Sequence, residues 1–257
     1  MNKNYALKRF GQNFLQDETV LKKIASTLDL KGKNIIEIGP GKGALSKLIL
    51  QEAKQLVAFE IDYNLCDFLK LEIKNNNFIL INEDFLKADL SKYKGYSIMA
   101  NIPYNITTSI LFKIFENNQN FDEIILMVQK EVAERISAIP GSTNYGKLTV
   151  SSSHFAEVKK LFDISPKAFF PSPKVTSSII HIKIKKVKPI IDDTEFLSFV
   201  KFCFAMRRKT LINNLKVQKN FDEQKITHFY LENNLNKDVR PQILTLNQYY
   251  ELFKCFS

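Results

Sequence analysis

The residues best suited to chemistry lie in the segment MANIPYNITT, residues 99–108. Pro103 fixes its own φ and biases Ile102 towards extended geometry, which predicts a rigid corner. The amide oxygen of Asn101 and carbonyls presented by the turn could accept both hydrogens of an exocyclic amine, while Tyr104 offers a flat face for a base. Such contacts would orient the lone pair of an adenine N6 towards a methyl donor. A proline turn with a packed tyrosine is the alternative interpretation.

A glycine-rich segment, residues 39–43 (GPGKG), lies between an expected strand and an expected helix. Gly39 and Gly41 would let a ligand approach the backbone there. Glu60 ends the next strand, where a doubly wound nucleotide-binding fold places a carboxylate on ribose hydroxyls. Dinucleotide sites favour GxGxxG, which seats a pyrophosphate on the helix N-terminus, and this spacing is absent. A cofactor without phosphates, such as S-adenosylmethionine, fits better, although glycines alone also suit a tight turn.

Two further side chains could complete such a site. Asp84 follows the third expected strand, so its carboxylate could accept a hydrogen bond from an adenine amino group, with Phe85 beside the ring. Capping of the next turn is the alternative role of Asp84. Phe169 lies in the stiff segment AFFPSPKV, residues 168–175, and could close the opposite face of a base held against Tyr104. Alone, this segment also suits a loop with buried aromatics.

Basic residues form three clusters in a chain of net charge +10 and pI near 9.3. They are Lys8 and Arg9, then Lys183, Lys185, Lys186 and Lys188, and finally Arg207, Arg208 and Lys209. Lysine and arginine pair with phosphates, arginine most directly. Each cluster alone suits a solvated face, but around one base pocket they favour binding of RNA or DNA.

The expected elements place these residues on one edge of a sheet. Strands at 35–38, 55–62, 77–85, 96–101 and 122–129 alternate with helices at 44–53, 63–74 and 107–115. This alternation predicts an α/β fold with a parallel, doubly wound sheet. Strands at 157–165 and 174–186 follow, then helical segments at 196–215 and 246–256. We expect one domain over 1–188 and a small helical domain over 189–257.

Composition narrows the class of protein. With 257 residues, 45% hydrophobic and 25% charged, the chain can bury a substantial core. It has no apolar run long enough to span a membrane and no secretory signal pattern at its start, so no membrane association is expected. Three separated cysteines favour a reduced, cytoplasmic location. Three scattered histidines predict no metal site.

Seven motifs, in order along nearly the whole chain, carry a family resemblance. They are KRFGQNFL, IEIGPGKGALS, NIPYNIT, NYGKLTV, FFPSPKVTSSI, MRRKTLINNL and RPQILTLNQYYELF. This set resembles the ribosomal RNA adenine N6-dimethyltransferases, and within them the bacterial small-subunit branch whose loss gives kasugamycin resistance. The resemblance implies a Rossmann-like class I methyltransferase domain with a mostly parallel seven-stranded sheet. It also implies S-adenosylmethionine-dependent dimethylation of two adjacent adenosines in the 3′-terminal hairpin loop of small-subunit (16S) rRNA, within an assembling ribosomal particle.

The resemblance also assigns residues. Cofactor contacts fall on Asn13, Leu15, Gly39, Glu60, Asp84 and Asn101, and the glycine loop adds Gly41. Target-base residues fall on Asn101, Pro103 (through its carbonyl), Tyr104 and Phe169. RNA contacts are implied for Arg207, Arg208 and Lys209, and the basic cluster near the start of the chain adds Lys8 and Arg9. Gln242 and Lys147 depart from the residues common in relatives, where Glu and Arg often stand.

Other functions remain as alternatives. The macrolide-resistance branch, which modifies large-subunit rRNA, shares the corner at Asn101, but the motif at 206–215 resembles the small-subunit branch more closely. A non-catalytic RNA-binding assembly factor is a second alternative. DNA adenine methylases usually have two prolines where Ile102-Pro103 stands, and the glycine spacing disfavours a dehydrogenase. We expect a monomer.

Overall fold

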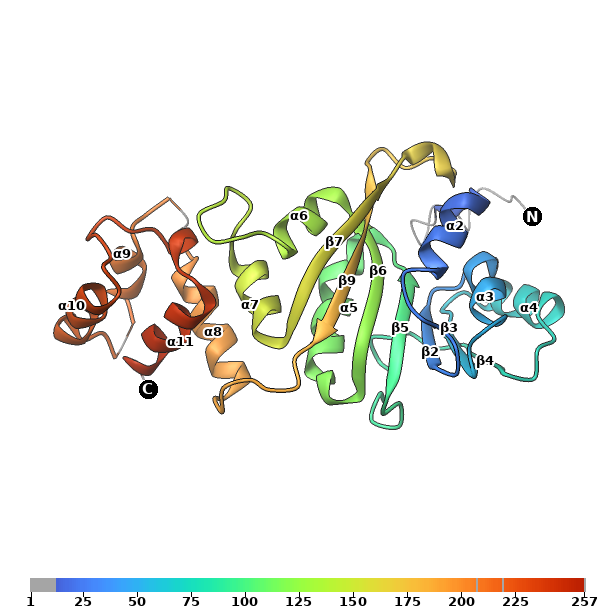
Figure 1. Ribbon diagram of the computed structural model, residues 1–257, viewed down its shortest axis with the longest axis horizontal. Coiled ribbons are helices and arrows are strands. Elements are labelled where there is room, and N and C mark those ends of the chain that lie inside the picture. The colour runs from blue at the N-terminus through green and yellow to red at the C-terminus, as the bar shows by residue number, and fades with distance from the viewer. Residues whose placement is uncertain (1–12, 207, 219, 257) are drawn as a thin grey trace. The chain divides into compact units, whose positions relative to one another are not determined.

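The computed structural model describes residues 13–206, 208–218 and 220–256 (Figure 1). Contacts within the chain divide it into two compact units. The α/β unit comprises residues 13–133 and Val158–Ile184, and the helical unit comprises Glu134–Glu157 and residues 185–256. The boundary expected from the sequence near Pro189 stays a prediction; the contact-based division differs from it chiefly by adding residues 134–157 to the helical unit.

A seven-stranded sheet organises the α/β unit in the order β4-β3-β2-β5-β6-β9-β7. The strands are β2 (Asn34–Ile38), β3 (Gln55–Phe59), β4 (Phe78–Ile81), β5 (Tyr96–Asn101), β6 (Phe121–Gln129), β7 (Ala156–Ile164) and β9 (Ser177–Ile184). The first five in spatial order pair in parallel, and β9 pairs antiparallel with β6. The predicted mostly parallel, seven-stranded α/β fold is therefore confirmed.

Helices cover the sheet through their apolar faces. They are α2 (Glu18–Ala25), α3 (Ala44–Ile49), α4 (Tyr63–Glu72) and α5 (Thr107–Glu116). The next helix, α6 (Lys130–Ile136), begins in the α/β unit, and its last residues belong to the helical unit. Leu45 and Ile49 of α3 and Leu69 of α4 join one buried cluster with Ile35 and Leu56 of the sheet. A small antiparallel pair, β1 (Phe14–Leu15) with β8 (Phe169–Phe170), joins two distant segments of the chain.

The helical unit contains α7 (Lys147–Phe155), α8 (Asp193–Cys203), α9 (Leu211–Leu215), α10 (Glu223–Glu232) and α11 (Leu246–Lys254). The expectation of one helical segment over 196–215 is wrong, because the helix is interrupted between α8 and α9. The fully buried Asn214 stabilises the interruption: its side chain accepts from Met206 N at 2.7 Å and donates to Thr210 O at 3.0 Å. These bonds satisfy backbone groups that a continuous helix would satisfy itself.

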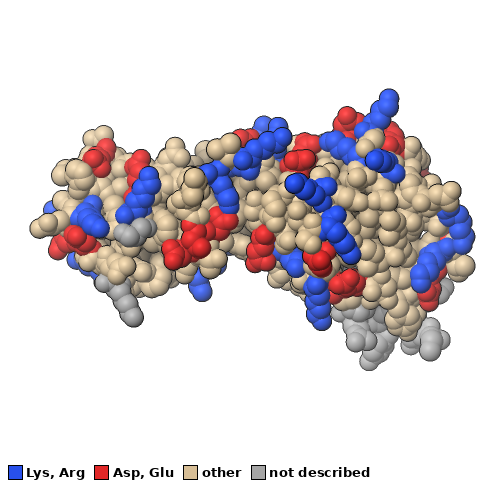
Figure 2. Space-filling view, turned by 90° about the horizontal axis from the view of Figure 1, so that it is seen from below, with Lys and Arg blue, Asp and Glu red and all other residues tan. Residues whose placement is uncertain are grey.

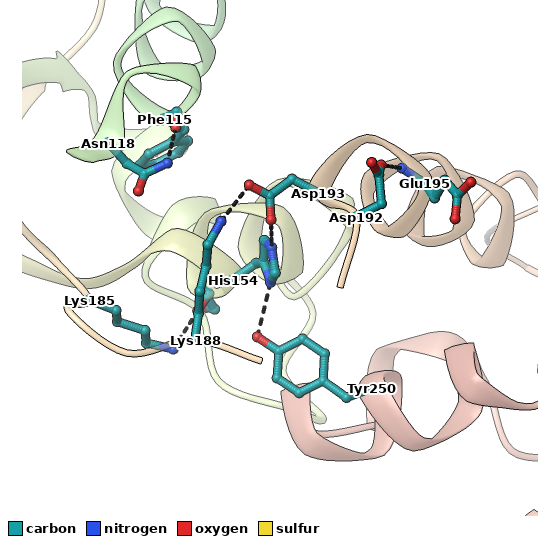
Figure 3. Close-up of polar contacts among 10 residues, drawn as sticks. Phe115, Asn118, His154, Lys185, Lys188, Asp192, Asp193, Glu195 and Tyr250 are labelled. Carbon is teal, nitrogen blue, oxygen red and sulfur yellow. Dashed lines mark hydrogen bonds and ion pairs between the residues drawn. The ribbon is translucent and has the colours of Figure 1, made fainter. Parts of the chain in front are cut away.

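A polar network around the buried His154 ties three of these helices together, as Figure 3 shows. His154 of α7 lies 2.8 Å from Asp193 Oδ1 of α8 through Nε2 and 3.0 Å from the Tyr250 hydroxyl of α11 through Nδ1. Lys188 donates to the other oxygen of Asp193. Burial lowers the pKa of His154, against the opposing effect of the Asp193 carboxylate. The neutral imidazole is therefore favoured in the fold.

Within the described residues, no helix is both long and apolar enough to cross a membrane.

Candidate active site

A cavity of about 760 Å³ opens at the carboxyl edge of the parallel strands in the α/β unit. Strand order reverses between β2 and β5, and such a switch point is where doubly wound sheets bind ligands. Eight of the predicted site residues line the cavity: Asn13, Leu15, Gly39, Gly41, Glu60, Asp84, Asn101 and Pro103. The sheet topology thus brings together residues from five separate segments.

The glycine loop forms the floor of this cavity between β2 and α3. Gly41 has a φ of +58°, which favours glycine, and its N–H donates to Glu60 Oε2 at 3.2 Å. Gly43 has a φ of +77°, and a Cβ there would lie 2.8 Å from a methyl carbon of Leu69. The glycine loop is therefore a tight turn that packs onto α4. The backbone of this loop also borders the cavity.

Glu60, at the end of β3, stabilises the glycine loop through a hydrogen bond. Only 3% of the residue is exposed, and besides Gly41 its carboxylate accepts from Asp62 N at 2.9 Å. Burial raises its pKa, while the bonds from Asp62 and Gly41 favour the charged form. A carboxylate fixed in this way can accept further hydrogen bonds from ligand hydroxyls on its remaining lone pairs.

Glu37 also lines the cavity, although no motif in the sequence predicted a role for it. It lies inside the apolar strand β2 with 2% exposure and accepts from Ser46 Oγ of α3 at 2.5 Å. Burial raises its pKa to about 8. An acidic residue in the middle of an apolar run, just before the glycine loop, was the available signal.

The predicted adenine contacts, Asp84 and Phe85, also line the cavity. Asp84 Oδ1 accepts from Leu86 N at 3.0 Å, so Asp84 caps the turn and lines the cavity at once. Phe85 is buried and meets Phe59 edge to face, with ring centroids 5.5 Å apart. One conformation of Asp84 is therefore compatible with both capping of the turn and a contact with an adenine amino group.

The corner after β5 borders this cavity and a second, smaller hollow of about 30 Å³ lined by Asn13, Asn101, Ile102, Pro103 and Tyr104. A Cβ on Gly39 would lie 3.9 Å from Asn101 O, which shows how closely the corner approaches the glycine loop. Pro103 O already accepts from Ile106 N at 3.2 Å, leaving its second lone pair. Asn101 and Pro103, which both carry oxygen acceptors, thus border both spaces.

Tyr104 and Phe169 have different surroundings. Tyr104 is half-buried, and its hydroxyl lies 2.7 Å from Ser177 Oγ. Phe169 is 5% exposed, packs in the main apolar cluster and pairs with Leu15 in the β1–β8 ladder, whereas Phe170 points outward at 64% exposure. Phe169 does not belong to the lining of either cavity within the described residues.

The predicted basic contacts are only partly described. Lys8, Arg9 and Arg207 lie outside the described residues, while Arg208 and Lys209 are exposed between α8 and α9. Lys185 donates to Ser153 O at 2.5 Å and Lys188 to Asp193, so half of the four-lysine cluster takes part in contacts within the helical unit. On the face shown in Figure 2, Lys and Arg are scattered, many of them beside Asp or Glu.

The donor set suits a particular class of cofactor. The raised pKa of Glu37 keeps its carboxyl group protonated at neutral pH. Glu60 and Asp84 line the same cavity, and their carboxylates would repel a pyrophosphate. The same groups can accept hydrogen bonds from ribose hydroxyls and an adenine amino group and favour a nearby cation. S-Adenosylmethionine offers all of these features, so the residues present fit it.

Comparison with known proteins covers the whole described chain. The model of a family described as ribosomal RNA adenine dimethylase matches residues 3–257. The ribosomal RNA small subunit methyltransferase A of Mycoplasmopsis pulmonis is 46% identical over 248 residues, which cover 96% of this chain and 98% of that protein.

Solved structures give the same fold. A dimethyladenosine transferase from Plasmodium falciparum is 28% identical with a TM-score of 0.80, over 93% of this chain and 95% of that one. The 23S rRNA methyltransferase ErmE has a TM-score of 0.76 at 23% identity, over 95% and 99% of the two chains, a likeness in fold alone. The expected Rossmann-like class I methyltransferase fold and the family resemblance are confirmed. The chain belongs to the ribosomal RNA adenine dimethylase family, and it is an S-adenosylmethionine-dependent rRNA adenine dimethyltransferase.

Proposed function

We propose that this enzyme dimethylates N6 of two adjacent adenosines in the 3′-terminal hairpin loop of small-subunit rRNA, within an assembling ribosomal particle. The observation that carries the proposal is the approach of the Asn101 corner to the glycine loop, so that acceptors for an amine border the cofactor cavity. The small-subunit substrate is supported by relatives named ribosomal RNA small subunit methyltransferase A, at 39–46% identity. Those names disfavour a large-subunit substrate.

Asn101 and Pro103 act as the paired acceptors. The Asn101 side-chain oxygen takes one N6 hydrogen and the free lone pair of Pro103 O takes the other. These bonds favour a pyramidal nitrogen, whose lone pair then points away from the ring and into the cavity, and they stabilise the positive charge that develops on nitrogen. Bound S-adenosylmethionine supplies the electrophilic methyl group. No strong base is required, because the proton leaves an already cationic amine.

The remaining side chains hold the two ligands. Glu60 accepts from ribose hydroxyls and Asp84 from the cofactor's adenine amino group, beside Asn13, Leu15, Gly39 and Gly41. Tyr104 stacks on the target base once the base has left its own stack. Phe169 can close the opposite face only if its side chain leaves the buried position it holds beside Leu15.

RNA contacts are proposed for Lys8, Arg9, Arg207, Arg208 and Lys209. Arg208 and Lys209 are exposed and therefore available to phosphates. We also propose that the enzyme works in the cytoplasm as a monomer. The three cysteines are free, which suits a reducing compartment.

Asn101→Ala tests the proposed chemistry, with Asn76→Ala, at an exposed position that lines neither cavity, as the matched control. We expect Asn101→Ala to lower methyl transfer to unmodified small-subunit particles by about 100-fold or more, as when a transition-state hydrogen bond is lost. Cofactor affinity, measured by calorimetry, should fall by no more than about tenfold. Near-normal transfer by Asn101→Ala contradicts the mechanism.

A further inference from the structure

The hydroxyl of Tyr104 is anchored by a residue that neither the family resemblance nor the cavity lining identified. Ser177 Oγ lies 2.7 Å from the phenol oxygen, and either group can donate. Ser177 is fully buried, whereas Tyr104 is half-buried at the edge of the small hollow. A buried serine with a neutral partner at this distance forms a hydrogen bond that solvent does not compete for.

The antiparallel strand β9 is what brings Ser177 to this edge. In the sheet, Asn101 of β5 lies opposite Met127 of β6, Met127 opposite Ile179, and Gln129 opposite Ser177. Because β9 runs against its neighbour, its first residue lies at the carboxyl ends of β5 and β6. The start of β9 therefore meets the corner that follows β5.

Alternation along β9 separates two neighbouring serines. Successive side chains of a strand point to opposite faces. Ser177 meets Tyr104, while Ser178, equally buried, donates to Asp163 Oδ1 at 2.7 Å. Ser178 thus provides an internal control, since it differs in its partner but not in its strand or burial.

The Tyr104 ring is consequently held at both ends. On the backbone side, Pro103 fixes the start of the 3-10 turn Tyr104–Ile106. On the far side, the bond to Ser177 prevents the ring from turning about its side-chain torsions. Burial raises the pKa of Tyr104, so the phenol is neutral at pH 7 and keeps its proton for this bond.

We propose that Ser177 is a positioning residue that acts through Tyr104, fixing the plane on which the target adenine stacks so that N6 meets Asn101 and Pro103. This assignment rests on the proposed function. Ser177 touches no reacting atom. Its loss should lower the rate constant for methyl transfer at saturating particle concentration, whereas affinity for the particle, which depends on phosphate contacts, should not change.

A double-mutant cycle tests the coupling. Ser177→Ala and Tyr104→Phe should each lower single-turnover methyl transfer to unmodified small-subunit particles by about 2- to 12-fold, the loss expected for one neutral hydrogen bond. Ser177→Ala should cost nothing more in the Tyr104→Phe background, and Ser178→Ala should retain the wild-type rate. Equal losses from Ser177→Ala in both backgrounds, or full activity of Tyr104→Phe, would overturn the assignment. Tyr104→Phe removes the same bond from the other side if Ser177→Ala fails to fold.

A second readout needs no RNA. In protein labelled at tyrosine ¹³Cζ, the Tyr104 resonance is the one of nine absent from Tyr104→Phe. It should move in Ser177→Ala and not in Ser178→Ala. An unmoved resonance in Ser177→Ala shows that the bond is not formed and overturns the assignment. If the wild-type enzyme transfers no methyl group to the particles, the proposed function fails, and the resonance still decides whether Ser177 fixes the ring.

Discussion

Replacing Glu37 by glutamine should make the protein more stable at alkaline pH. Glu37 is enclosed in the α/β unit at 2% exposure, with Ser46 Oγ as its hydrogen-bond donor. Burial raises its pKa from 4.5 to about 8, and the nearby Glu60 adds to the effect. Glutamine keeps the size of the side chain and an oxygen for Ser46 but cannot ionise.

Stability falls with rising pH because the folded protein binds the Glu37 proton more tightly than the unfolded chain does. The folded protein holds the Glu37 proton up to about pH 8, while the unfolded chain releases it near 4.5. The stability that this proton provides is complete below pH 4.5 and is lost as pH rises towards 8. Because each tenfold change in proton affinity is worth about 1.4 kcal/mol, the loss approaches about 5 kcal/mol above pH 8. Between pH 6 and pH 9 it amounts to about 3 kcal/mol.

Urea unfolding at these two pH values measures the effect. The unfolding free energy of Glu37→Gln, relative to wild type, should increase by about 3 kcal/mol between pH 6 and pH 9. Asp89→Asn is the control, because the hydrogen bonds from Ser91 lower the pKa of Asp89, and this carboxylate is ionised at both values. The difference in unfolding free energy between this control variant and wild type should be the same at both pH values. A constant difference for Glu37→Gln as well would show that the folded protein does not hold the Glu37 proton into the alkaline range.

Three other perturbations have defined outcomes. Gly43→Ala should lower the unfolding free energy by about 2–4 kcal/mol in the same urea assay, because the new Cβ would lie 2.8 Å from a leucine methyl carbon of α4 at a φ of +77°. Gly32→Ala, with a similarly positive φ and no atom within 4 Å of the new Cβ, should lower it by only about 1 kcal/mol. Burial lowers the pKa of His154, so the stability that the neutral imidazole provides is lost as pH falls below about 6.5. The difference in unfolding free energy between wild type and His154→Gln should therefore be smaller at pH 5.5 than at pH 7.5, and an unchanged difference contradicts this. Substituting Arg207 and Arg208 with Gln should weaken binding to small-subunit particles and make this binding less dependent on salt concentration, while cofactor affinity measured by calorimetry should not change. An equal loss of cofactor affinity would indicate a structural role for these residues.

Local sequence patterns were sufficient for most of the α/β unit. Parallel strands buried on both faces appear as continuous apolar runs, and those at 34–38, 55–59 and 96–101 are bounded by glycine, aspartate or proline turns. Their carboxyl ends must meet at one edge, which is why residues as distant as Gly39 and Asn101 could be assigned to one cavity.

Features that depend on distant partners could not be predicted in this way. The two-residue strand β8 exists because Phe169 pairs with Leu15, and that pairing buries a side chain expected at the target base. Asn214 resembles a surface residue of a helix, yet its burial is what interrupts the segment between α8 and α9. Ser177 lies in an ordinary alternating strand, and only the sheet order reveals that it reaches Tyr104.

The most direct test of the proposed substrate is methyl transfer from labelled S-adenosylmethionine to small-subunit particles that lack the modification and, separately, to large-subunit rRNA, followed by mapping of the labelled base. We expect N6-dimethyladenosine at two adjacent positions in the 3′-terminal hairpin loop of the small-subunit rRNA. Label on large-subunit rRNA would contradict the substrate, and cofactor binding without transfer to either RNA would contradict the chemistry assigned to Asn101.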